Sequence, residues 1–189
     1  MSLVLFVINV NAQTKKESFL SRVYFPFNLG YSLTSNSSIN SGGLIKTGVE
    51  YRLKKSNGLF MRFNFDNRSN YYKIPENSAT NVTEGKIKFN DNIIGIGYRL
   101  GKQKLKAIGL LQAGVLSYGY STVTGTTNDY KIIDKKANVV ICKFILGAEY
   151  YIRQNAAITI EIDYFTISKH SIFLGNVFGI SLGYTTTIF

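Results

Sequence analysis

The stretch GVEYRL at residues 48–53 returns twice in the chain, as GIGYRL at residues 95–100 and as GAEYYI at residues 147–152. Each copy closes a run in which apolar and polar residues alternate, and a short polar turn follows each copy at once. Segments that have similar C-terminal sequences and are each followed by a short turn indicate equivalent strands of a repeated β-hairpin unit. The repeats therefore predict an all-β fold built from hairpins.

The alternating runs around these repeats predict eight strands. Within residues 43–53, Ile45 and Val49 fall on one face and Lys46 and Glu50 on the other, as expected for side chains with a period of two. The same pattern places the strands at residues 22–33, 43–53, 58–66, 86–100, 105–120, 138–152, 157–167 and 178–189. We expect a bulge near residues 91–93, where the alternation loses its phase, and a bulged or frayed segment around Pro26.

The connections between these strands alternate in length. Short turns are predicted at residues 54–57, 101–104 and 153–155. Long polar loops are predicted at residues 34–41, 67–85, 121–136 and 168–174. Alternating long and short connections are typical of an up-and-down barrel that crosses a membrane.

Composition limits the classes of protein and of site. The 189 residues, 45% of them hydrophobic, suit one domain, and the 13 Tyr and 13 Phe favour strands. The net charge is +11, and lysines gather at two of the turns, Lys54 and Lys55 at one and Lys102, Lys104 and Lys106 at the other. Basic groups at strand ends suit lipid headgroups better than nucleic acid. A single cysteine, Cys142, excludes an intramolecular disulfide. A lone histidine and the absence of a phosphate-binding loop predict no metal and no cofactor.

The first residues look like a secretory signal. The apolar run LVLFVINV at residues 3–10 is followed by Asn11, Ala12 and Gln13, which is typical of a signal peptide cleaved after Ala12. No basic residue precedes the run, so we expect that the true start lies upstream of Met1. The predicted organisation is a signal peptide at residues 1–12, a short periplasmic segment at residues 13–21 and a β-barrel at residues 22–189.

Alternation alone leaves open which face lines the barrel. A soluble lipocalin-like barrel places apolar residues inside, whereas a membrane barrel places them outside. The polar face carries charges of both signs and many glycines, which would let long side chains pair inside a narrow lumen. The predicted lumen charge network consists of Lys46, Glu50, Arg52, Arg62, Asp66, Arg99, Lys143, Glu149, Glu161 and Asp163.

Tyrosines near strand ends suggest two interfacial girdles of a membrane barrel. The girdle on the side of the short turns would contain Tyr24, Tyr51, Tyr98 and Tyr150, and the girdle toward the long loops Tyr31, Tyr118, Tyr120 and Tyr164. The chain ends on Phe189 after an alternating strand. This terminal aromatic resembles the signal by which outer-membrane proteins are recognised for assembly, and a bulge at residues 185–187 would bring it into phase.

Together these residues resemble the outer-membrane β-barrel family of small porin-like proteins of Bacteroidota. The resemblance implies an eight-stranded antiparallel up-and-down transmembrane β-barrel in the outer membrane of a Gram-negative cell. It also implies contact with outer-membrane lipid and lipopolysaccharide, and recognition of Phe189 by the barrel assembly machinery.

Three functions follow from these patterns. The first is a non-enzymatic barrel with a plugged polar lumen, which acts in envelope structure or surface interaction through its extracellular loops, with an unknown envelope protein as a partner. The second is an enzyme that modifies lipid A, similar to small barrels that deacylate it, with His170, Ser171 and Glu161 as the candidate catalytic residues. The deacylase pattern separates its His and Ser by one residue, but here they are adjacent, which favours the first function. The third is a soluble lipocalin-like barrel that binds a ligand.

Overall fold

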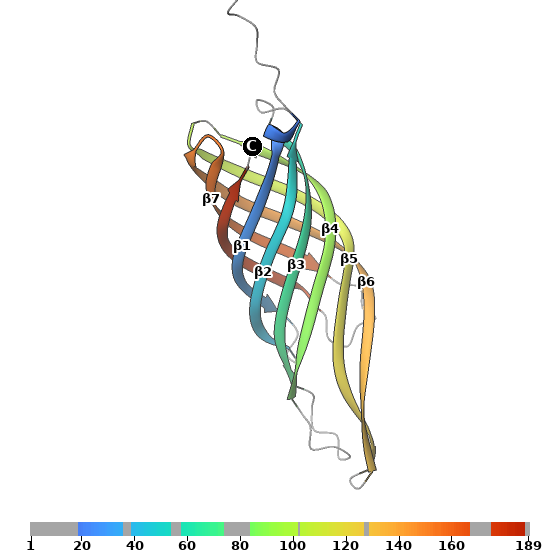
Figure 1. Ribbon diagram of the computed structural model, residues 1–189. Helices are drawn as coiled ribbons and strands as arrows, with labels where there is room; N and C mark the ends of the chain where they lie inside the picture. Colours follow the sequence, from blue (N-terminus) through green and yellow to red (C-terminus); the bar gives the residue numbers. More distant parts are fainter. Residues whose placement is uncertain are drawn as a thin grey trace, which may run out of the picture.

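Figure 1 shows a computed structural model of the chain, in which eight antiparallel strands form a closed barrel. The structure describes residues 19–35, 39–53, 58–73, 84–101, 103–126, 129–166 and 175–187. After a short 3₁₀ helix, η1 (Leu20–Arg22), the strands are β1 (Val23–Thr34), β2 (Ile39–Arg52), β3 (Leu59–Lys73), β4 (Glu84–Leu100), β5 (Leu105–Thr126), β6 (Asp129–Arg153), β7 (Ala156–Thr166) and β8 (Val177–Thr186). Each strand pairs with its neighbours in sequence, and β1 closes the barrel on β8. The predicted eight-stranded antiparallel barrel is therefore confirmed.

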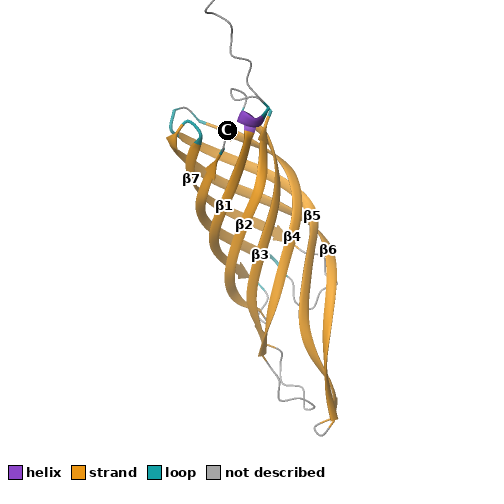
Figure 2. Ribbon diagram, viewed as in Figure 1, coloured by secondary structure: helices purple, strands orange, loops and turns teal. Residues whose placement is uncertain are grey.

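The two ends of the barrel differ in their connections (Figures 1 and 2). The turn end, at the top of both figures, carries the short β2–β3, β4–β5 and β6–β7 connections. The loop end carries the β1–β2, β3–β4, β5–β6 and β7–β8 connections. Gly58 and Gly101 border two of the short turns with φ of 68° and 134°, and these left-handed conformations favour glycine because it lacks a Cβ.

Strands at the loop end are longer than the sequence pattern predicts. β3 and β4 stay paired to Lys73 and Glu84, and β5 and β6 stay paired to Thr126 and Asp129. Most of the expected loop at residues 121–136 is therefore a two-stranded hairpin, which extends beyond the other strands at the lower end of Figure 1. A strand that leaves the membrane no longer has to alternate apolar and polar residues, so the pattern ends before the strand does.

The predicted bulges are wrong. β4 keeps one register with β3 and with β5 through residues 91–93, and β8 keeps one register with β1 and β7 through Thr186. β1 has the same register with β2 on both sides of Pro26, which pairs with Thr185 of β8. The β1–β2 ladder skips Phe25 and Pro26 and resumes in the same register at Phe27, which accommodates a residue that has no backbone donor.

Outward-facing side chains form an apolar belt around the barrel. Leu29, Ile96, Leu146, Ile160 and Leu182, from five different strands, are 47–61% exposed. A belt of this kind is stable only in apolar surroundings such as lipid. No helix among the described residues is long and apolar enough to cross a membrane.

Candidate functional site

The lumen holds all ten charged residues of the predicted network. Each of them is buried, and the most exposed, Arg52 and Arg99, keep only 7% of their surface accessible. They point inward because each has the strand parity opposite to that of the belt residues. The charges therefore have to be satisfied by one another, since buried ions without partners are costly.

Glu50 of β2 is the centre of the group nearest the turn end. Its carboxylate accepts hydrogen bonds from Arg52 Nε at 2.9 Å, Arg62 Nη2 at 3.0 Å and Arg99 Nη2 at 2.6 Å. Arg62 is its register partner on β3, whereas Arg99 reaches it from β4. Three guanidinium groups on one fully buried carboxylate fix the rotamers of four side chains across three strands.

Glu149 of β6 connects this group to the opposite wall. Arg99 Nε donates to Glu149 Oε2 at 2.8 Å, and the Tyr151 hydroxyl donates to the same oxygen at 2.8 Å. Arg99 thus links Glu50 and Glu149 across β5. These contacts connect β2, β4 and β6, which do not pair with one another in the sheet.

Glu161 and Asp163 of β7 face Lys46 of β2 across the lumen. Lys46 Nζ lies 2.7 Å from Glu161 Oε2 and 3.2 Å from Asp163 Oδ1, and Glu161 also accepts a hydrogen bond from Arg62. The glycines of the polar face make room for these groups, as predicted from the sequence: a Cβ added at Gly179 would come within 2.5 Å of the Asp163 carboxylate.

A second charged group lies toward the loop end. Lys143 Nζ is 2.6 Å from Asp66 Oδ2 and 2.8 Å from Asp91 Oδ2, and Arg68 also forms an ion pair with Asp91. Arg68 and Asp91 are missing from the predicted network, although Arg68 shares the parity of Arg62 and Asp66 on β3. With them, the described lumen holds six basic and six acidic side chains in ion pairs, so its formal charge is balanced.

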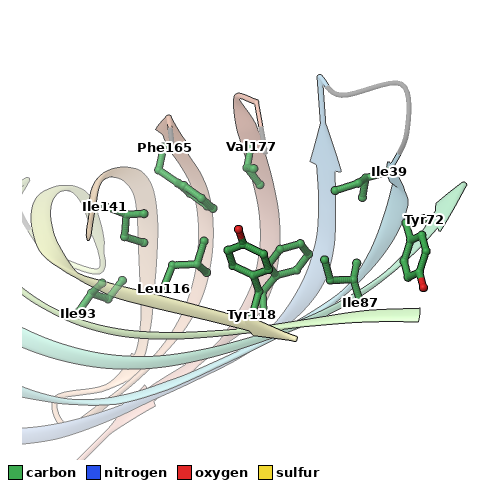
Figure 3. Close-up of a cluster of buried hydrophobic side chains, with 10 residues drawn as sticks. Ile39, Tyr72, Ile87, Ile93, Leu116, Tyr118, Ile141, Phe165 and Val177 are labelled. Carbon is green, nitrogen blue, oxygen red and sulfur yellow. The ribbon is translucent and has the colours of Figure 1, made fainter. Parts of the chain in front are cut away.

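An apolar cluster lines the lumen around this charged group and toward the loop end (Figure 3). The sequence pattern did not predict it. Its buried members are Ile39, Tyr72, Ile87, Phe89, Ile93, Leu116, Tyr118, Ile141, Phe165 and Val177. Phe165 connects the apolar cluster to the charged group. Arg68 Cζ lies 4.2 Å from the centroid of its ring, and Lys143 Nζ lies 5.2 Å from the same centroid. A cavity beside this cluster measures only about 10 Å³, which is room for about one water molecule.

Three of the predicted girdle tyrosines face the lumen. Tyr24 is 1% exposed and stacks on the Arg52 guanidinium, Tyr118 is 8% exposed, and Tyr120 packs against the apolar cluster. Their assignment to the girdles is wrong because a position near a strand end does not fix which face a side chain takes. The remaining five lie on the outward face: Tyr31, Tyr51, Tyr98, Tyr150 and Tyr164.

The candidate catalytic residues do not form a site in the described chain. Glu161 is fully buried in the lumen and is held by Lys46 and Arg62, so it cannot orient a base on the lipid-facing wall as a deacylase would require. His170 and Ser171 lie outside the described residues, as does Phe189. The role of Phe189 in assembly stays a prediction.

The family follows from comparison with known proteins. Residues 2–185 match the model of the outer membrane protein beta-barrel domain family. The chain belongs to this family. It is therefore an outer-membrane protein, as predicted, and the soluble lipocalin-like alternative is wrong. No curated protein matches the chain.

Solved structures show the same fold. The chain is similar to Neisserial surface protein A, with 17% identity over 88% of this chain and 97% of that one, and a TM-score of 0.65. It is also similar to the outer membrane protein OprG from Pseudomonas aeruginosa, with 10% identity over 87% and 94% of the two chains and a TM-score of 0.53. Outer-membrane barrels keep short turns in the periplasm and longer loops outside, so the turn end is periplasmic and the loop end extracellular.

Proposed function

We propose that this protein is a non-enzymatic outer-membrane barrel whose lumen is closed to solutes and whose extracellular end contacts the cell envelope or surface partners. The proposal rests on one observation: two sets of buried side chains, one charged and one apolar, occupy successive parts of the lumen. Charged groups bridge opposite walls through the middle of the barrel, and a cluster of buried apolar side chains lines the part nearer the loop end.

The two layers oppose passage for different reasons. A hydrated ion that reached the charged layer would have to displace pairs such as Lys143–Asp66, and separating two buried charges is costly. The aliphatic and phenyl side chains of the apolar cluster offer no hydrogen bonds to water or to a polar solute that leaves the bulk, and the hydroxyls of Tyr72 and Tyr118 are the polar groups among its members. An eight-stranded barrel is only wide enough for its own side chains, which agrees with this closed interior.

The extracellular end then becomes the working surface. There β5 and β6 continue as a paired ladder past the last residues of β4 and β7 with which they pair. A hairpin anchored by two membrane-spanning strands presents its contacts at little cost in conformational entropy.

Single-channel recording in planar bilayers tests the closed lumen. We expect no stable conductance of porin size from the wild-type barrel, after its insertion has been verified by gel mobility. The variant Phe165→Ala removes a ring that is 1% exposed in the lumen, and Phe144→Ala removes one that is 45% exposed on the outer wall. We expect brief openings to increase only for Phe165→Ala; stable porin-size steps from the wild type would refute the proposal.

A separate measurement tests the absence of enzymatic activity. We expect lipid A isolated from cells that express the protein to keep the acyl chain number of lipid A from control cells, as measured by mass spectrometry. The buried, ion-paired state of Glu161 supports this expectation. Loss of an acyl chain that depends on His170 or Ser171 would restore the deacylase hypothesis.

A further inference from the structure

A basic groove lies on the extracellular part of β4, β5 and β6. Its volume is about 750 Å³, and Lys86, Lys88 and Lys136, which have the outward parity, are among its lining. Asp134 is the one acidic residue among the lining, and Lys135, which also lines the groove, has the inward parity of its register partner Tyr120. None of the four lysines forms an ion pair within the described part of the chain. The groove therefore carries unneutralised positive charge, unlike the balanced lumen.

The strand register arranges part of this groove as a cradle. Lys88 of β4 pairs with Gly119 of β5, and Gly119 pairs with Lys136 of β6, so the three residues form one row across the outer wall. A Cβ added at Gly119 would meet nothing closer than 3.8 Å. The floor between the lysines is thus open, and their backbones lie about 10 Å apart across two strand spacings. Two ammonium groups on flexible stems can converge on one anion there.

The next row toward the membrane adds polar groups on the same face. It consists of Asn90, Ser117 and Asn138, which are again register partners across the three strands. Asparagine amides and a serine hydroxyl can donate hydrogen bonds to phosphate or sugar oxygens. The cradle therefore offers two charges and three polar side chains to a single ligand.

Farther toward the turn end the rows become apolar and merge with the membrane belt. The next row holds Asn92 of β4 beside Val115 and Val140, with Val140 77% exposed, and the row after it holds Ile94, Ala113 and Cys142. The cradle thus lies where the outward face changes from polar to apolar, and it faces the same way as the belt. That is the level of the headgroups of the extracellular leaflet.

Between the cradle and the membrane belt, the outward side chains of β5 are short. Its outward residues Gly119, Ser117, Val115 and Ala113 are all small or short, and their partners on β4 are the longer side chains Lys88, Asn90, Asn92 and Ile94. An extended acyl chain attached to a headgroup in the cradle would run along this strip. A soluble anion would make no use of the strip.

We infer that this cradle binds a phosphate of an outer-leaflet phosphorylated glycolipid of the lipid A class, with an acyl chain along β5. The lysines of β4 and β6 hold the phosphate, and the Asn90–Ser117–Asn138 row holds the adjoining sugar. Binding would fix the base of the β5–β6 hairpin to the membrane surface. The site does not depend on whether the lumen conducts, so it stands apart from the proposed closed lumen.

Native mass spectrometry of the folded full-length barrel in detergent micelles tests this site. The probes are bisphosphorylated lipid A, dephosphorylated lipid A and a soluble sulfated polysaccharide. We expect the wild type to retain bisphosphorylated lipid A at least roughly tenfold more strongly than the dephosphorylated form, as expected when two lysines meet an anionic headgroup. Equal retention of the two lipids overturns the inference without need of any variant.

Variants locate the site. Lys88→Glu combined with Lys136→Glu should weaken lipid A binding at least roughly tenfold, and Gly119→Val should weaken it with the charge unchanged, because it fills the floor. The matched control, Lys104→Glu with Arg153→Glu, makes the same charge change at the turn end and should stay within about twofold of the wild type.

Two outcomes of the variant experiment contradict the inference. Equal losses in the test and control pairs would mean that lipid A responds to net charge alone. Displacement of lipid A by the soluble polysaccharide at equal phosphate and sulfate concentration would assign the groove to a soluble polyanion instead of a lipid. Retention of the heat-dependent gel shift by every variant verifies that each has folded.

Discussion

Replacement of Lys143 by methionine would break the charged layer nearest the apolar cluster. Lys143 is fully buried, and its Nζ lies 2.6 Å from Asp66 and 2.8 Å from Asp91. Methionine keeps an unbranched side chain that is one atom shorter, and it removes the ammonium group with its charge and its hydrogen bonds to Asp66 and Asp91. Asp91 would keep its ion pair with Arg68, but Asp66 would lose its only cation within 4.0 Å among the described residues.

The magnitude follows from these distances. At an effective dielectric constant of about 20, each of the two contacts is worth about 6 kcal/mol of Coulomb energy. The desolvation of Lys143 and of the two carboxylates offsets the larger part of that energy. We therefore expect Lys143→Met to lower the free energy of unfolding by about 3–5 kcal/mol, as is found when one partner of a buried pair is removed.

A second variant distinguishes the loss of the Lys143–Asp66 ion pair from any change in side-chain packing at residue 143. The double variant Lys143→Met, Asp66→Asn leaves Asp91 with Arg68 and leaves no lone carboxylate, so it should recover most of the loss. Lys136→Met is the matched control on the same strand, because Lys136 is exposed and has no ion pair within the described chain. Its effect should stay within about 0.5 kcal/mol.

Urea titration in lipid vesicles measures these differences. The chain has no tryptophan, so circular dichroism and the gel mobility of unboiled samples are the suitable signals. The reasoning fails if Lys143→Met is no more destabilising than Lys136→Met. It also fails if the double variant is less stable than Lys143→Met alone, since that would mean that the carboxylate of Asp66 does not need a cation.

Three further predictions test the barrel itself. Boiled and unboiled samples should migrate differently on a denaturing gel, because a closed ladder has no free edge from which detergent can open it; identical mobility would contradict a closed barrel. Ile160→Arg, at the middle of the apolar belt, should lower folding into vesicles by about 2–4 kcal/mol and Thr166→Arg, at the outer end of the same strand and face, by about 0–1 kcal/mol; equal effects would mean that the belt is misplaced. Leu116→Ala should cost about 2–5 kcal/mol in urea titration because Leu116 is fully buried in the lumen, whereas Leu111→Ala on the lipid-facing wall should cost clearly less; the reverse order would contradict the apolar cluster.

The strand period made the charged lumen predictable from the sequence. A side chain on a strand can take only two directions, so one correct assignment of a face, such as Lys46 and Glu50 inward on β2, fixes every other residue of that strand. The pairing partners could not be predicted in the same way. Lys143 of β6 meets Asp66 of β3 across the lumen, and that distance depends on barrel closure, which no local pattern encodes.

The apolar cluster escaped prediction for a different physical reason. Ile87, Phe89 and Ile93 share the inward parity of Asp91 and Arg99 on β4. In the sequence, this mixture resembles a slip of phase, and a bulge was therefore expected. The inner wall instead carries charged and apolar side chains on the same strand, with Asp91 between Phe89 and Ile93, while the register stays continuous. Alternation identifies faces only where each face keeps one chemical character along the whole strand.

The charge balance of the lumen shows where the excess positive charge of the chain lies. The chain has 22 basic and 11 acidic residues, and the lumen network takes six of each sign. The whole net charge of +11 therefore belongs to the rest of the chain. On the extracellular side, the described part of that excess includes the lysines of the groove on β4 and β6. Charge that neutralises nothing inside the protein is free to attract anions outside it, which agrees with the anionic lipid site that we propose on β4, β5 and β6.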